Sequence, residues 1–145
     1  VCLHLSQKIN GMIKEVWMNL PVRNLETAKD FYTRIGFTPS ENGNGAISAG
    51  FKIGNKNVVM MIFENPALSY LAQTGVADTS VASEIMISLD TESREEIDMF
   101  ADRVKNAGGV IFSGPKESQG WLYGFGFQDP DGHRWNVLYM DMAKI

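Results

Sequence analysis

The sequence predicts an α+β fold in which two β-α-β-β-β modules form a curled mixed sheet around a cavity. The strand-helix order occurs twice, over residues 16–36 and again over residues 84–109, and strand-like segments follow each copy. A chain of 145 residues that is 44% hydrophobic is long and apolar enough for one domain, so the modules are halves of it. The expected divisions are a loose N-terminal extension 1–12 and a domain 13–143, comprising modules 13–64 and 83–143 and connector 65–82.

The first module begins with a strand over residues 16–22, where apolar side chains alternate with Trp17, Asn19 and Pro21. Since proline lacks an amide donor, Pro21 is expected where no ladder hydrogen bond is needed, near an edge or an end of the sheet. Asn24 is a suitable N-cap for the amphipathic helix that follows. Two further strands, at 46–51 and 58–63, flank a predicted hairpin turn at 54–57.

The second module repeats this order from a strand at 84–89. Ser93 and Glu96 form a capping-box pattern for the next helix, which ends at Gly108. A short strand is expected at 110–112. Residues 121–128 then alternate aromatic residues with glycine and polar residues, and the turn 129–132 leads into a last strand at 135–140.

Charge and composition exclude several classes of partner. The 13 basic and 17 acidic residues give a formal charge of −4 with no basic cluster, so nucleic acid is not an expected partner. No apolar run of about 18 residues could span a membrane, and no signal peptide is evident, so a cytoplasmic location is expected. Cys2 is the only cysteine, which excludes an internal disulfide and argues against thiol catalysis.

Four short motifs occur in an order typical of one superfamily. They are Asn-Leu-Pro-Val at 19–22, Phe-Tyr at 31–32, Gly-Phe at 36–37 and Phe-Gln-Asp-Pro-Asp-Gly-His-Arg-Trp at 127–135. In this order the chain resembles the vicinal-oxygen-chelate superfamily of glyoxalase I, bleomycin-resistance proteins and extradiol dioxygenases, nearest to small bacterial predicted lactoylglutathione lyases. The resemblance spans residues 13–142. It implies a two-module fold, a homodimer, and in catalytic members a divalent metal that chelates two substrate oxygens.

The chain departs from that family at the metal ligands. The four ligand positions fall on Trp17, Glu84, Asn136 and Val59, or Met61 if the register shifts by one pleat. One carboxylate and one amide do not make a cage for a hard cation, so no metal and no other cofactor is expected. His4 lies in the extension, and His133 is expected to stabilise the turn, with a ligand or general-base role as the alternative.

The strand phases predict which side chains face the cavity. On this basis the proposed ligand-binding residues are Trp17, Asn19, Met61, Met86, Ser88 and Asn136, and the tentative catalytic residue is Glu84. Tyr123 is a further proposed ligand-binding residue, because its glycine-rich strand could flex to admit a ligand or pair with a partner chain. A carboxylate in an apolar cleft would have a raised pKa and could move a proton or bind a cation. The alternatives are that Glu84 begins its strand in solvent, that the methionines fill a packed core, and that Tyr123 is a core or dimer contact.

Three functions remain open at this point. The first is a homodimeric protein that binds a small hydrophobic or cationic molecule in the cavity between the modules, without the usual metal. The second is a lyase or isomerase of the lactoylglutathione lyase type, which only the resemblance supports. The third is a dimeric subunit without ligand chemistry. The missing ligand positions favour binding over catalysis.

Overall fold

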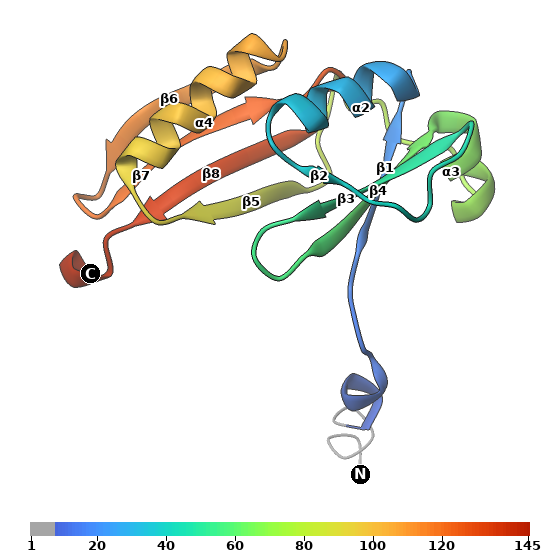
Figure 1. The fold of residues 1–145 in the computed structure, drawn as a ribbon, viewed down its shortest axis with the longest axis horizontal. Coiled ribbons are helices and arrows are strands. Elements are labelled where there is room, and N and C mark those ends of the chain that lie inside the picture. The colour runs from blue at the N-terminus through green and yellow to red at the C-terminus, as the bar shows by residue number, and fades with distance from the viewer. Residues whose placement is uncertain (1–7) are drawn as a thin grey trace.

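The computed structural model describes residues 8–145 and contains two four-stranded mixed sheets, with the two longest helices on one side of them (Figure 1). The expectations for Cys2 and His4 lie outside the described residues. Within the predicted loose extension, residues 8–12 are helical and exposed, and residues 13–17 lead from them to the first strand. No helix of residues 8–145 has the length and apolarity that crossing a membrane requires.

The first module contains β1 (Met18–Val22), α2 (Leu25–Arg34), β2 (Thr38–Pro39), β3 (Ser48–Ile53), β4 (Val58–Glu64) and α3 (Asn65–Ala72). Its strands are ordered β1-β4-β3-β2, with β1 parallel to β4 and β3 antiparallel to it. The edge position predicted for the Pro21 strand is therefore confirmed. Helix α3 lies where only a connector was expected, and Pro66 stands in its first turn, where a missing amide donor is tolerated.

The second module contains β5 (Met86–Thr91), α4 (Arg94–Asn106), β6 (Val110–Ser118), β7 (Leu122–Gln128) and β8 (Arg134–Met140), followed by the 3-10 helix η1 (Met142–Lys144). The order β5-β8-β7-β6 repeats that of the first sheet. Strand β6 is longer than the predicted 110–112 because it continues past two register irregularities while still pairing with β7. The predicted repeat of two modules is thus confirmed.

The two long helices begin at the predicted caps. The side chain of Asn24 accepts a 2.9 Å hydrogen bond from the Thr27 amide, and Ser93 accepts one of 3.2 Å from the Glu96 amide. Each cap satisfies an amide that the first helical turn leaves without a partner. Each helix then buries one apolar face against its own sheet.

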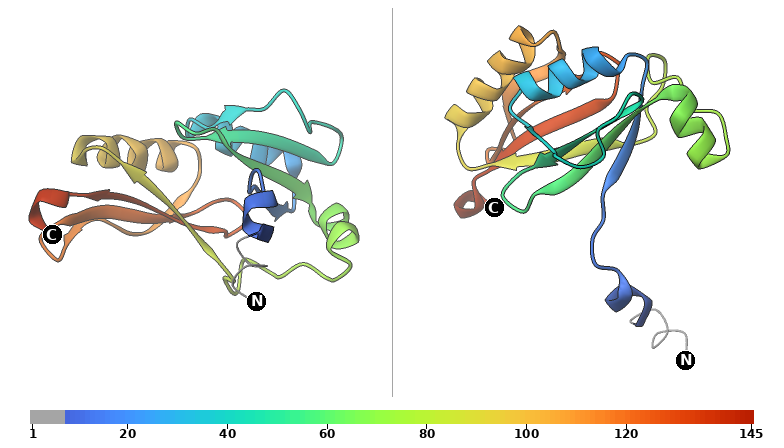
Figure 2. Two further views of the ribbon diagram at one scale, coloured as in Figure 1. Left: turned by 90° about the horizontal axis from the view of Figure 1, so that it is seen from below. Right: turned by 45° about the vertical axis from the view of Figure 1, so that its right-hand side comes forward.

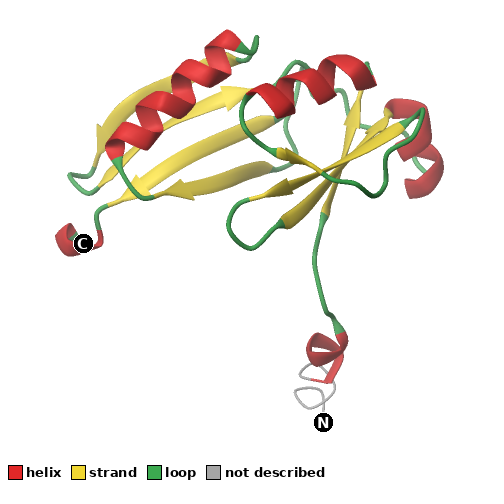
Figure 3. Ribbon diagram, in the orientation of Figure 1, coloured by secondary structure: helices red, strands yellow, loops and turns green. Residues whose placement is uncertain are grey.

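An aromatic core joins the two modules on the side of the helices. The ring centroids of Tyr32 and Trp135 lie 5.8 Å apart, and those of Phe31 and Phe127 lie 6.2 Å apart. Helices α2 and α4 lie on the same side of the molecule, above their sheets in Figure 1, and Figures 2 and 3 show the same layering. Each sheet therefore has a covered face and a face turned away from the helices, here called its open face.

The predicted cavity is not closed within the chain. The strands form two separate sheets with no ladder between them, and the open faces stay accessible to solvent. The physical reason is that the largest buried side chains, including Tyr32, Phe127 and Trp135, gather on the helix side. Hydrophobic burial therefore brings the modules together along that side and leaves the open faces uncovered.

Candidate functional site

Three of the predicted ligand-binding residues lie on the open side of the first sheet. Asn19 of β1 pairs with Met61 of β4, and Trp17 stands one residue before β1. Trp17 is 54% exposed, whereas Leu20 and Val22 are buried on the opposite side. The predicted strand phase is therefore correct here, because successive side chains of a strand alternate between its two faces.

Three more predicted residues share the open face of the second sheet. Ser88 of β5 pairs with Asn136 of β8, and Met86 pairs with Arg134. Met86 is 55% exposed, while the neighbouring β8 residue Trp135 is fully buried on the helix side. The amide oxygen of Asn136 is buried and accepts no hydrogen bond from residues 8–145. Each sheet thus presents a mixed polar and apolar open face.

Tyr123 lies on the opposite face from this group, so the structure does not bring it together with the other proposed ligand-binding residues. Its hydroxyl donates a 2.6 Å hydrogen bond to Asp98 of α4, and the Arg94 guanidinium lies 4.8 Å from its ring centroid. The hydrogen bond to Asp98 raises the pKa of Tyr123. The signal was present in the sequence, because Tyr123 alternates in phase with Phe125 and Phe127, which are core residues.

Glu84 is exposed in a bend two residues before β5, so it does not lie in an apolar cleft. The alternative that it meets solvent ahead of the strand is the one observed. Strand β5 begins at Met86 because that is where pairing with Arg134 of β8 begins. The placement of Glu84 gives no support to a catalytic role.

The residues at the family's metal positions do not fit a divalent ion. Trp17 offers no ligand atom, Asn136 offers one neutral oxygen that is buried, and Met61 offers a soft thioether. Among residues 8–145, no three His, Cys, Asp or Glu side chains come together as a metal site would require. These side chains therefore do not supply the ligand set that a divalent ion needs at this position.

A buried polar network joins the modules at the turn 129–133. The hydroxyl of Tyr32 donates a hydrogen bond to Oδ2 of Asp129, and Oδ1 of Asp129 accepts the amides of Asp131 and His133 at 3.0 and 2.9 Å. Burial raises the pKa of Asp129, although His133 and the Tyr32 hydroxyl oppose this rise. Burial, together with the Asp129 carboxylate, raises the pKa of Tyr32 well above its usual range.

The same turn also binds the end of β1. A ring nitrogen of His133, Nε2, lies 2.6 Å from the carbonyl oxygen of Pro21, and the Arg23 amide donates a 2.8 Å hydrogen bond to Asp131. His133 is buried, and its structural role agrees with the turn-stabilising prediction. The sequence identified the turn but gave no sign that its partners lie in the other module.

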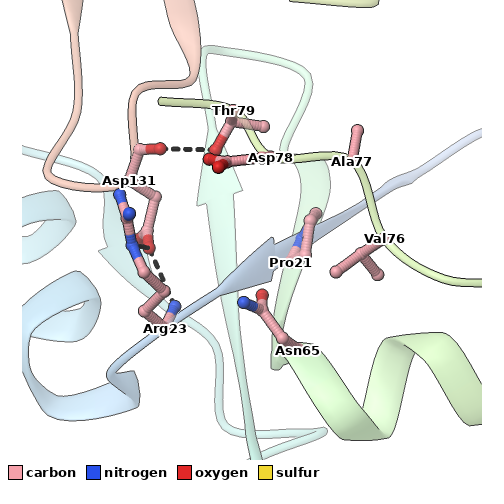
Figure 4. A pocket seen from close by; sticks show the side chains of 8 residues that line it. All are labelled: Pro21, Arg23, Asn65, Val76, Ala77, Asp78, Thr79 and Asp131. Carbon is pink, nitrogen blue, oxygen red and sulfur yellow. Dashed lines mark hydrogen bonds and ion pairs between the residues drawn. The ribbon is translucent and has the colours of Figure 1, made fainter. Parts of the chain in front are cut away.

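A polar cavity of about 250 Å³ lies beside this junction (Figure 4). It is lined by Pro21, Arg23, Asn65, Val76, Ala77, Asp78, Thr79 and Asp131. The ion pair between Arg23 and Asp131 and the hydrogen bond from Thr79 to the Asp131 carbonyl occupy much of its polar lining. None of the predicted site residues reaches this cavity, so it belongs to the junction between modules.

Comparisons with known proteins agree with this architecture. The family model described as "Glyoxalase/Bleomycin resistance protein/Dioxygenase superfamily" matches residues 14–137. The chain belongs to this superfamily. The resemblance stated from the motifs is confirmed, and so is the glyoxalase-like fold of two modules. A search of the curated proteins found no match.

Solved structures of the same architecture include a hypothetical protein, SA1046, from S. aureus, which is 36% identical with a TM-score of 0.78 over 91% of this chain and 98% of its own. The fosfomycin resistance protein FosX from Mesorhizobium loti is 16% identical, with a TM-score of 0.66 over 90% of this chain and 95% of its own. TnmS3, an antibiotic-binding protein from Streptomyces, is 21% identical, with a TM-score of 0.60 over 88% of this chain and 97% of its own. The last two likenesses show the fold alone.

Proposed function

We propose that the protein binds a small, largely apolar molecule against the open faces of its two sheets and does so without a metal ion. The faces combine exposed indole and thioether groups with the amides of Asn19 and Asn136 and the hydroxyl of Ser88. Small-molecule sites commonly have this composition, an apolar wall with a few polar groups that fix orientation. Methionine adapts to irregular apolar ligands because its side chain is flexible and polarizable.

The observation that carries the proposal is that large apolar side chains lie exposed on the open side, whereas helices α2 and α4 on the other side expose few. Trp17, Met86 and Phe112 are 54%, 55% and 43% exposed, and all three lie on the open side. On α2 and α4, within the described chain, Met99 is the only exposed large hydrophobic residue. Apolar groups gathered on one side of a protein mark an interaction surface, because leaving them in water is unfavourable.

A second copy of the chain would complete the site. One chain leaves both open faces uncovered, whereas a ligand pocket normally buries most of its ligand. A homodimer in which the first sheet of one copy faces the second sheet of the other would enclose a cavity lined by both. TnmS3 is described as an antibiotic-binding protein, which makes small-molecule binding a precedent for this fold without assigning a ligand here.

The test compares two methionines of equal exposure on opposite sides of the molecule. Met86 on the open face and Met99 on α4 are each 55% exposed. Met86→Ser is expected to weaken the binding of hydrophobic probe compounds, such as 1-naphthol, about 5- to 10-fold, while Met99→Ser leaves their affinity unchanged. Affinity is measured by isothermal titration calorimetry after the metal content of the protein has been determined by elemental analysis.

Equal effects of the two substitutions would contradict the proposal, since the open faces would then have no special part in binding. Tight stoichiometric metal in the purified protein would also contradict it. So would turnover of the methylglyoxal–glutathione hemithioacetal with Ni²⁺ or Zn²⁺, which would favour the lyase alternative. We expect the protein to sediment as a dimer. A monomer at the concentrations used for the binding measurements would contradict a cavity shared between two copies.

A further inference from the structure

We propose that the open face of the second sheet recognises an aromatic molecule through a carboxylate on that molecule, with Arg134 as its counter-ion. This inference rests on the proposed function and names the chemical class of the ligand. It replaces the earlier expectation of a cationic ligand, which depended on Glu84 lying in a cleft. Arg134 lies on this face and forms no ion pair within residues 8–145. Lys116, opposite Gly124 near the other end of the sheet, is a second cation of this kind.

Arg134 has no ion-pair partner among residues 8–145, whereas the comparable Arg94 has one. Arg134 lies over the ring of Phe112, with its guanidinium carbon 4.5 Å from the ring centroid. Arg94 lies in the same way over Tyr123 at 4.8 Å, but it also forms a 2.8 Å ion pair with Glu117. The described ion pairs include none at Arg134. The charge of Arg134 is therefore still available to a ligand.

The contact of Arg134 with the Phe112 ring is a cation–π contact, and no ion pair within residues 8–145 uses the N–H donors of its guanidinium. A guanidinium that stacks uses the face of its plane, while its N–H donors point outward from the edge. A carboxylate binds such an edge through two parallel hydrogen bonds, which adds directional specificity to the charge attraction. An ammonium ligand, by contrast, would be repelled at this position.

A glycine in the sheet makes room for the ring of Phe112. Phe112 lies on β6, and its ring packs over Gly126 of β7, where a Cβ atom would come within 2.5 Å of the ring. With no side chain at Gly126, the ring reaches across β7 toward Arg134 on β8. The ring fixes the position of the guanidinium and remains 43% exposed, so it also offers an apolar surface to an aromatic ligand.

The neighbours of Arg134 supply the rest of a binding surface. Met86 of β5 lies opposite Arg134. Asn136 lies two residues further along β8, and its side-chain oxygen accepts no hydrogen bond from residues 8–145. The acidic residue of β5 on this face, Asp90, is four positions beyond Met86, about 13 Å along the strand. Asp90 is thus too distant to neutralise Arg134.

The experiment compares three probes that share one aromatic ring system: 1-naphthoate, its neutral isostere 1-naphthamide, and 1-naphthylmethylamine. Isothermal titration calorimetry with the intact protein at pH 7 is expected to rank naphthoate first. Arg134→Gln should weaken naphthoate about 10-fold and leave naphthamide within about 2-fold, since only the acid uses the charge. Arg94→Gln is the matched control and should change neither affinity.

Each contrary result has its own meaning. If naphthamide binds as tightly as naphthoate in both the wild type and Arg134→Gln, the inference is overturned while small-molecule binding stands. Preferred binding of the amine, or binding of no probe, also overturns it. If Arg134→Gln shifts the dimer toward monomer in sedimentation without changing the naphthoate-to-naphthamide ratio, Arg134 pairs with a second copy, and the ligand carboxylate is excluded.

Discussion

The hydrogen bond between Tyr32 and Asp129 is expected to be a major contribution to the joining of the two modules. Tyr32 lies on α2 of the first module, Asp129 lies in the turn before β8, and both are buried. Tyr32→Phe removes only the hydroxyl, so the ring keeps its contacts with Phe37 and Trp135 and no cavity forms. The substitution therefore measures the hydrogen bond to a buried carboxylate.

The magnitude follows from the burial of the pair. Hydrogen bonds to charged groups contribute about 1.5–3 kcal/mol, so Tyr32→Phe should lower the free energy of unfolding by about 2 kcal/mol. The chain contains a matched control in Tyr123, whose hydroxyl donates to the exposed carboxylate of Asp98. Tyr123→Phe should cost less than about 0.5 kcal/mol, because water replaces an exposed hydrogen bond.

Urea unfolding followed by tryptophan fluorescence and circular dichroism measures both variants. With an m-value of about 2 kcal/mol/M, Tyr32→Phe should lower the urea midpoint by about 1 M. Tyr123→Phe should leave the midpoint nearly unchanged. If the two substitutions lower the unfolding free energy equally, burial does not strengthen the Tyr32–Asp129 bond, and the account of the junction given above is refuted.

Two further predictions concern the second module. Burial raises the pKa of Asp129 in the folded protein. Protonation of this group therefore stabilises the fold fully below the unfolded pKa of about 3.9, and the stabilisation is lost as the pH rises through the folded pKa. In thermal melts, lowering the pH from 7 to 4 should raise the stability of the wild type relative to that of Asp129→Asn. Gly124→Ala should cost about 2–3 kcal/mol in urea unfolding, since its Cβ would meet the backbone carbonyl of Val137. Gly126→Ala would displace a half-exposed side chain, the ring of Phe112, and no backbone atom, so it should cost less, under about 1 kcal/mol.

Most of the local structure could be predicted from the sequence. The caps at Asn24 and Ser93, the hairpin at 54–57 and the alternation along β1 depend on residues close together in the chain. The two faces of each sheet follow from that alternation, so the shared sides of Asn19 and Met61 and of Ser88 and Asn136 were predictable as well. The alternation along β7 likewise puts Tyr123 in phase with the core residues Phe125 and Phe127.

Other features required contacts between distant residues. Helix α3 lies within the expected connector 65–82, where Pro66 is compatible with a first helical turn as well as with a loop. Glu84 lies outside its strand because pairing begins at Met86 opposite Arg134, a partner that local patterns do not reveal. The stacking of Phe112 on Arg134 likewise joins β6 and β8 across the glycines of β7.

The sequence by itself determined the two repeated modules and the side to which most strand residues turn, because these depend on local periodicity. The tertiary structure alone decided how the modules meet. Burial of Tyr32, Phe127 and Trp135 joins them on the helix side, and the turn 129–133 fixes the junction. The open faces are left in solvent because the energetic gain from packing these aromatic side chains is available only on the side of the helices.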